Sequence, residues 1–161
     1  MVSMDVQFIT EALNKSLAIE YAGVIQYYQH SFLIQGTERE YLADFFRSSS
    51  KNSLDHAERL GKKIVALGGL PTVEPGTIRQ TNDVKEMLRQ ALELEREAQS
   101  AHHSALKLLS GKDEAAEETA LRVMLEELIE AEQQDIDNLE MLLSSKRPAV
   151  TAKEVRLKQA P

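Results

Sequence analysis

Apolar residues recur at steps of three and four along four long segments, which is the spacing of an amphipathic helix. The segments cover residues 4–35, 38–67, 82–109 and 114–144. In the first segment the repeating positions are Ile9, Leu13, Leu17, Val24 and Tyr27. Gly and Pro are scarce in the 161 residues, while Ala, Leu, Glu and Lys are plentiful, and this composition also favours helices. The pattern predicts a single all-α domain of four helices.

The first two helices are expected to be antiparallel neighbours, because the turn between them is short. Gly36 is a suitable residue just past a helix end. The four residues 37–40 then have the T-x-x-E form of a capping box that starts the second helix. Gly68, Gly69 and Pro71 end that helix.

Residues 69–81 form a much longer connection, rich in Pro and Gly. Thirteen extended residues span about 40 Å, and a helix of thirty residues is about 45 Å long. This connection can therefore run the length of a bundle, so the second and third helices are expected to be parallel. The sequence predicts a four-helix bundle over residues 1–145 with a long crossover between helices two and three. Residues 146–161 are predicted to be a basic tail or a short fifth helix.

Each predicted helix carries an ionisable residue on its inward stripe, near its middle. These residues are Glu20, His56, Glu95, Glu132 and Asp135. A buried charge must be paired, protonated or bound to a cation, since its desolvation is costly. Carboxylates and imidazoles converging in a bundle indicate a metal site, and these ligands suit iron or manganese, with zinc also possible.

Four collinear segments extend this interpretation: LNKSLAIEYAGVIQYYQH (13–30), HAERLGKKIVALGGLP (56–71), DVKEMLRQALELE (83–95) and EAEQQDIDNLE (130–140). Over nearly its whole length the chain resembles a bacterioferritin. The resemblance implies a ferritin-like four-helix bundle that binds one or two iron ions, oxidises them and stores them in an oligomeric shell. It also implies that Tyr27, seven residues after Glu20, holds a ligand and supplies an electron.

Three positions depart from the bacterioferritin pattern. Ser53 stands where the family has a bridging Glu, and Asp135 stands where it has a His. Leu54 replaces the methionine that holds haem, so no haem is expected. With five ligands in place of six, weak or altered iron oxidation is expected.

Composition narrows the remaining classes. The chain has no Cys, which excludes thiolate metal sites and a Cys nucleophile. Its net charge of −7 disfavours nucleic acid as a partner. No signal-like start or long apolar run is present, so the expected location is the cytoplasm, away from membranes.

Simpler interpretations remain open at individual positions. Glu20 could be a buried acid bonded to Tyr27, Glu132 could belong to a solvated charged face, and Ile136 could take the inward position of Asp135. His102, seven residues after Glu95, is interpreted as a structural or outer-sphere residue.

Two other functions compete with iron storage. The chain could be a structural subunit with a decayed metal site, assembling with itself or with a ferritin-like paralogue. It could also be a small di-metal oxygenase or peroxidase on the same fold.

Overall fold

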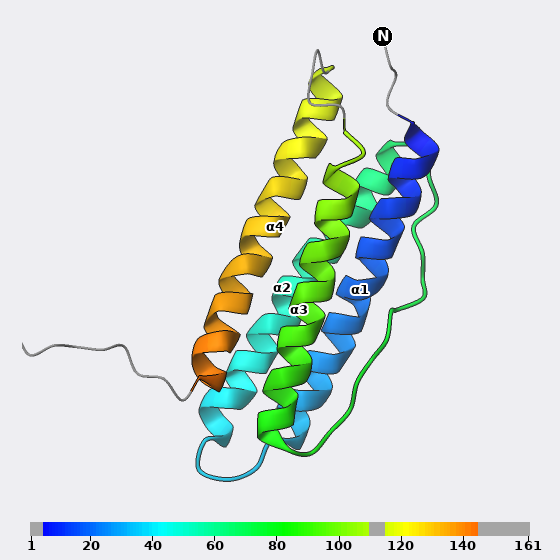
Figure 1. The fold of residues 1–161 in the computed structure, drawn as a ribbon. Coiled ribbons are helices and arrows are strands. Elements are labelled where there is room, and N and C mark those ends of the chain that lie inside the picture. The colour runs from blue at the N-terminus through cyan, green and yellow to red at the C-terminus, as the bar shows by residue number, and fades with distance from the viewer. Residues whose placement is uncertain (1–4, 110–114, 145–161) are drawn as a thin grey trace, which may run out of the picture.

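A computed structural model describes residues 5–109 and 115–144. Its four helices are α1 (Val6–Leu33), α2 (Arg39–Ala66), α3 (Val84–Leu106) and α4 (Ala116–Leu143). They form one bundle, in which α1 packs against α2 and α3, and α3 packs against α4 (Figure 1). The predicted all-α bundle with a long crossover between its second and third helices is confirmed. The proposed tail, 146–161, lies outside the described residues.

The helices begin and end slightly inside the predicted bounds, because the flanking residues act as caps and turns. The side chain of Asp5 accepts from the first backbone N–H groups of α1, and Asp83 does the same for α3. The predicted capping box at residues 37–40 is wrong: the N-cap of α2 is Glu38, and it makes no side-chain capping bond. Gly36 has φ +97°, so residues 36–38 form the turn and the helix starts only at Arg39.

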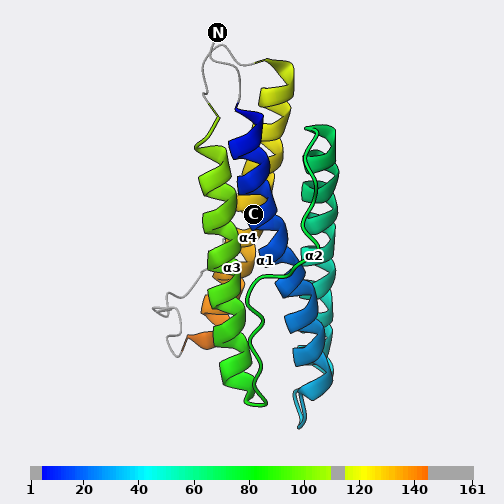
Figure 2. The ribbon, with the colours of Figure 1, turned by 90° about the vertical axis from the view of Figure 1, so that its right-hand side faces the viewer.

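The crossover, residues 67–83, follows α1 from one end of the bundle to the other (Figure 2). Several of its backbone N–H groups bond to α1. The Gly76 N–H donates to the carbonyl of Ala18 at 2.6 Å. The N–H of Thr72 donates to Asn14 Oδ1, and the N–H of Arg79 donates to Gln26 Oε1, each at 2.8 Å. These bonds satisfy backbone groups that the crossover, lacking regular structure, would otherwise leave unpaired.

The core is divided into two apolar clusters. One contains Leu13, Leu17, Leu60, Leu125 and Leu128, with their neighbours. The other is built around Tyr27, Phe46, Met87, Leu94 and Leu139. The stretch of α1 between Leu17 and Ala22 passes from the first cluster to the second, and Glu20 lies on it. A polar layer therefore separates the two halves of the core.

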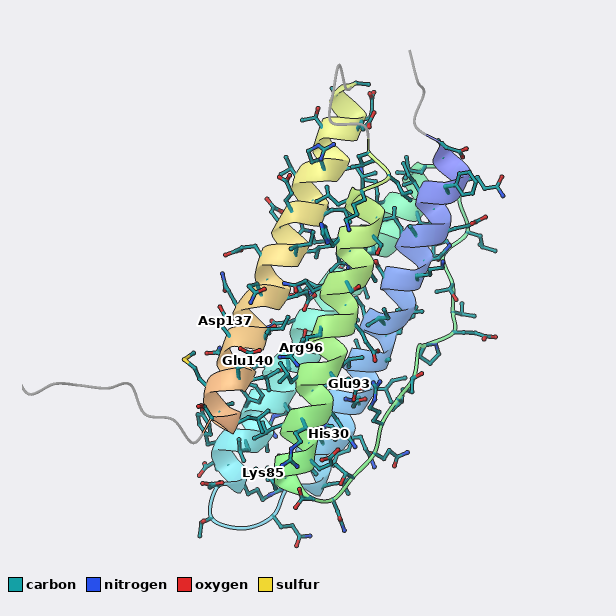
Figure 3. The ribbon with its side chains drawn as sticks, viewed as in Figure 1. His30, Lys85, Glu93, Arg96, Asp137 and Glu140 are labelled. Carbon is teal, nitrogen blue, oxygen red and sulfur yellow. The ribbon has the colours of Figure 1, made fainter. Side chains whose placement is uncertain are left out.

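Ion pairs add contacts on the outside of the bundle. A guanidinium nitrogen of Arg96 on α3 lies 2.6 Å from Oε1 of Glu140 on the adjacent helix α4 (Figure 3). Such exposed pairs contribute little, about 0–1 kcal/mol each. Across the described helices, none is long and apolar enough to span a membrane.

Candidate metal centre

The structure brings the five predicted ligands into the polar layer between the apolar clusters. Glu20, Glu95 and Glu132 are 3%, 6% and 1% exposed. His56 and Asp135 are half-buried. Glu20, Glu95 and Glu132 are therefore not surface acids, and the alternative of a solvated face for Glu132 is wrong. Ile136 takes the fully buried position of its turn, while Asp135 reaches the layer from the edge.

Two carboxylate oxygens lie between two imidazoles. Oε1 of Glu132 is 2.9 Å from His56 Nδ1 and 3.3 Å from His102 Nε2. Oε1 of Glu20 is 3.5 Å from His56 Nδ1 and 3.0 Å from His102 Nε2. Each of the four helices thus contributes one side chain to this set.

His102 lies in the same layer as the five predicted residues. Its ring is fully buried, and Nε2 lies within hydrogen-bond distance of Oε1 of both Glu20 and Glu132. Its Nδ1 atom has no partner among the described residues. The signal was present in the sequence, since His102 follows Glu95 by seven residues on the same inward stripe.

A second set of donors contains no imidazole. Carboxylate oxygens of Glu95, Glu132 and Asp135 all lie within 4.8 Å of one another. Tyr27 donates a hydrogen bond to Oε1 of Glu95. The alternative in which Tyr27 satisfies Glu20 is therefore wrong, because its hydroxyl reaches across to α3.

Protons offset the negative charge of the buried carboxylates. Burial would lower the pKa of His56, but Glu132 and Glu20 outweigh it and raise that pKa to about 10. The same two carboxylates raise the pKa of His102 against burial. Burial also opposes ionisation of Glu132, yet hydrogen bonds from Glu95 and the imidazoles hold its pKa well below its usual range. His56 is therefore cationic at neutral pH, and the same two carboxylates favour the cationic form of His102.

The oxygen-only set behaves differently. Burial, reinforced by Glu132, raises the pKa of Glu95 well above that of an ordinary glutamate. Burial and Glu132 also raise the pKa of Asp135 to about 6. Burial and Glu95 raise the pKa of Tyr27, so its phenol stays a donor. Burial and Glu132 thus favour the protonated form of Glu95, which donates a hydrogen bond to Glu132.

These donors fit a divalent cation. Imidazole nitrogens and carboxylate oxygens are the ligands that iron, manganese and zinc accept in proteins. Protons on the imidazoles supply positive charge between Glu20 and Glu132, and a bound metal ion would take the place of those protons. One metal ion would then contact side chains from four helices and offset the negative charge of the carboxylates.

Ser53 and Leu54 explain what the centre lacks. The Ser53 side chain is buried against α1, where its Oγ lies 2.6 Å from the position of a Cβ on Gly23. Leu54 is 51% exposed. Helix α2 therefore gives the centre only His56.

This arrangement is that of a known family. The ferritin family model, described as a ferritin-like domain, matches residues 10–147. The chain belongs to the ferritin-like family. The ferritin-like chain is 34% identical to a ferritin-like, diiron-carboxylate protein of Bacillus anthracis whose crystal structure is known; the match covers 89% of this chain and 100% of the other, with a TM-score of 0.81.

Relatives of this ferritin-like chain carry two kinds of name. A nutrient stress-induced DNA-binding protein of Synechococcus is 32% identical over 75% of this chain and 72% of its own length. A bacterioferritin of Mycobacterium leprae is 27% identical over 84% of each. The predicted resemblance to bacterioferritins is confirmed. Because the Synechococcus relative is named a DNA-binding protein, the expected absence of a nucleic-acid partner is left unsupported.

Proposed function

We propose that this ferritin-like chain binds Fe(II) at Glu20, His56, Glu95, Glu132 and Asp135, oxidises it and stores the product, with oxidation slower than at a full six-ligand centre. One observation carries the proposal. Buried donors from all four helices meet in one layer of the core, with nitrogen–oxygen distances of 2.9–3.5 Å around Glu20 and Glu132. Diiron-carboxylate chemistry in the structural relative agrees with it.

The chain's own residues have distinct roles in this proposal. Glu132 faces both donor sets and would bridge two ions. Tyr27 fixes the orientation of Glu95 through its hydrogen bond and lies close enough to supply an electron. Iron is the substrate and dioxygen the electron acceptor. The layer lies between two apolar clusters, and ions would enter it beside its half-buried members, His56 and Asp135.

Aerobic addition of Fe(II) to the metal-stripped protein tests the proposal, with oxygen uptake and ferric absorbance followed together. Uptake faster than that of iron alone is expected, and His56→Ala should abolish the acceleration. His103→Ala is the matched control, because His103 is exposed and next to a centre residue. Equal rates in wild type and His56→Ala would contradict the site assignment.

A structural subunit with a decayed metal site is the second candidate. One observation favours it: His56 and His102 pair with Glu20 and Glu132, so no charge in this set is left isolated. Under this candidate the metal-stripped protein binds no Fe(II) in the core and wild-type uptake equals that of iron alone.

The oxygenase alternative has less support. A groove of about 1310 Å³ lies between α1 and α3 beside the crossover, but none of the centre residues lines it. An organic substrate held there would not reach the donors.

We also propose that the chain assembles into an oligomer in the cytoplasm, since stored iron needs an enclosing shell. Light scattering on the purified protein tests the assembly: a monomer would contradict storage. A gel-shift assay with duplex DNA at physiological salt tests the nucleic-acid question, and the net charge of −7 predicts no shift.

A further inference from the structure

Nitrogen and oxygen donors are unevenly distributed in the centre. Both imidazoles, His56 and His102, contact Glu20 and Glu132. Glu95 and Asp135 form the other donor set with Glu132, and this set contains oxygen alone. Glu132 is the one residue of the described chain that the two donor groups share.

We infer that His102 is a direct metal ligand and that the centre consists of two chemically unlike metal positions joined by Glu132. This inference rests on the proposed function. The nitrogen-containing position comprises Glu20, His56, His102 and Glu132, one ligand from each helix. The oxygen-only position comprises Glu95, Glu132 and Asp135.

The imidazole that α4 lacks at Asp135 is thus supplied by α3. Helices α3 and α4 are packed neighbours, so an inward residue on either can reach the same layer. His102 groups with Glu20 and Glu132, whereas Asp135 groups with Glu95 and Glu132, so the second nitrogen belongs to the same donor set as Glu20.

The two positions should differ in affinity and selectivity. Two imidazoles and two carboxylates match ions such as Fe(II), Co(II) and Zn(II), which bind nitrogen well. Three carboxylates match Mn(II), which accepts oxygen ligands and stands lower in the affinity series. The oxygen-only position also shares Glu132 with the nitrogen-containing position. An ion bound at the nitrogen-containing position therefore weakens binding at the oxygen-only position. Filling is therefore sequential, with the nitrogen-containing position first.

Titration of the metal-stripped full-length protein with Co(II) tests this order, because its visible d–d bands report the ligands and calorimetry reports the stoichiometry. Wild type should show one tight and one weak equivalent. His102→Gln should weaken the tight equivalent by at least about tenfold, since loss even of outer-sphere partners costs about 10–100-fold in affinity. His103→Gln, at the exposed neighbour, should bind as wild type does. Asp135→Asn should weaken the second equivalent alone.

The outcomes separate this inference from the proposed function. The proposed function is contradicted if wild type binds no Co(II), or if His56→Gln binds Co(II) as tightly as wild type does. Wild type that binds tightly while His102→Gln and His103→Gln behave alike overturns the inference and leaves the proposed function standing. X-ray absorption of wild type with one equivalent of Co(II) separates a direct ligand from an outer-sphere partner, whose loss would also weaken binding, and it does not depend on the folding of His102→Gln. Two imidazoles in that spectrum support the inference, and one imidazole overturns it.

Discussion

The hydroxyl of Tyr27 on α1 donates a hydrogen bond to Oε1 of Glu95 on α3, inside the core. The two residues belong to different halves of the chain, since the crossover separates α1 and α2 from α3 and α4. Tyr27 is 1% exposed, so water cannot replace the bond. The contact both orients a candidate ligand and ties the two halves together.

Replacement of Tyr27 by Phe is expected to destabilise the metal-stripped protein. The substitution keeps the ring but leaves a buried acceptor on Glu95 without its donor, which costs about 1–3 kcal/mol. Urea unfolding followed by circular dichroism measures the change. Tyr41→Phe, at a residue that is 66% exposed, should unfold at the wild-type midpoint. Equal midpoints for both variants would show that the Tyr27 bond carries no stability.

Gly23 allows α1 and α2 to approach closely beside the metal centre. A Cβ at this position would lie 2.6 Å from Ser53 Oγ and 3.2 Å from its Cβ. Gly23→Ala is therefore expected to lower the free energy of unfolding by about 1–3 kcal/mol through overpacking. Gly61→Ala is the control within the bundle, because a Cβ there meets nothing within 4 Å.

The control should move the stability in the opposite direction. Alanine in place of a helical glycine stabilises by about 0.4–1 kcal/mol when the backbone suits it. Denaturant midpoints that fall for Gly23→Ala and rise for Gly61→Ala would agree with the close approach at Ser53. A rise for both would mean that the helices separate without cost.

Alkaline pH should destabilise the metal-stripped protein. The pKa of His56 is raised to about 10 in the folded state, against an ordinary value of 6.5. Its contribution is therefore fully present below pH 6.5 and is lost as pH rises through about 10, because the folded state then gives up a proton. Unfolding midpoints measured from pH 6.5 to 9.5 should fall, and should fall less in His56→Gln. A flat profile in wild type would contradict the pairing of His56 with Glu132.

Acid should destabilise the protein through a different histidine. His30 is fully buried and its ring lies edge-on to Phe46 at 5.2 Å. Burial lowers the pKa of His30 to about 4, and contacts with Gln90 and the Arg79 backbone offset this only in part. The unfolded chain takes up a proton below pH 6.5 while the folded chain does not. Stability should fall between pH 6.5 and 4, by up to about 3 kcal/mol.

The His30→Phe variant isolates this effect, since it removes the titrating group and keeps an aromatic ring. Its unfolding midpoint should lose the part of the acid slope that lies between pH 6.5 and 4. His103→Phe, at an exposed position, should keep the wild-type slope.

The helices and their order could be predicted from the sequence because strong local signals mark them. Gly68 has φ +84°, and the two prolines in residues 69–81 exclude a continuous helix there. The capping box at residues 37–40 misled because a T-x-x-E sequence also fits a turn. The left-handed Gly36 extends the turn to residue 38, so α2 starts at Arg39, one residue later than the pattern predicts.

The centre was only partly predictable for a related reason. Inward stripes identify buried acids such as Glu20 and Glu95, which the structure buries. They do not fix the rotation of one helix against another, on which the contacts of His102 and the half-burial of Asp135 depend. Distances between residues on α3 and α4 arise from packing, which becomes visible only in three dimensions.

The division of the candidate ligands between the two halves of the chain has a consequence for the order of folding. Helices α1 and α2 are consecutive in the chain and pack against each other, as do α3 and α4, so each pair, here called a hairpin, forms contacts between residues that are close in sequence. Docking of the two hairpins needs contacts between distant residues and is entropically slower. Glu20 and His56 arrive on one hairpin, and Glu95, His102 and Glu132 arrive on the other. These side chains can therefore meet only after the two hairpins have docked. Metal binding at the centre thus reports that this docking is complete.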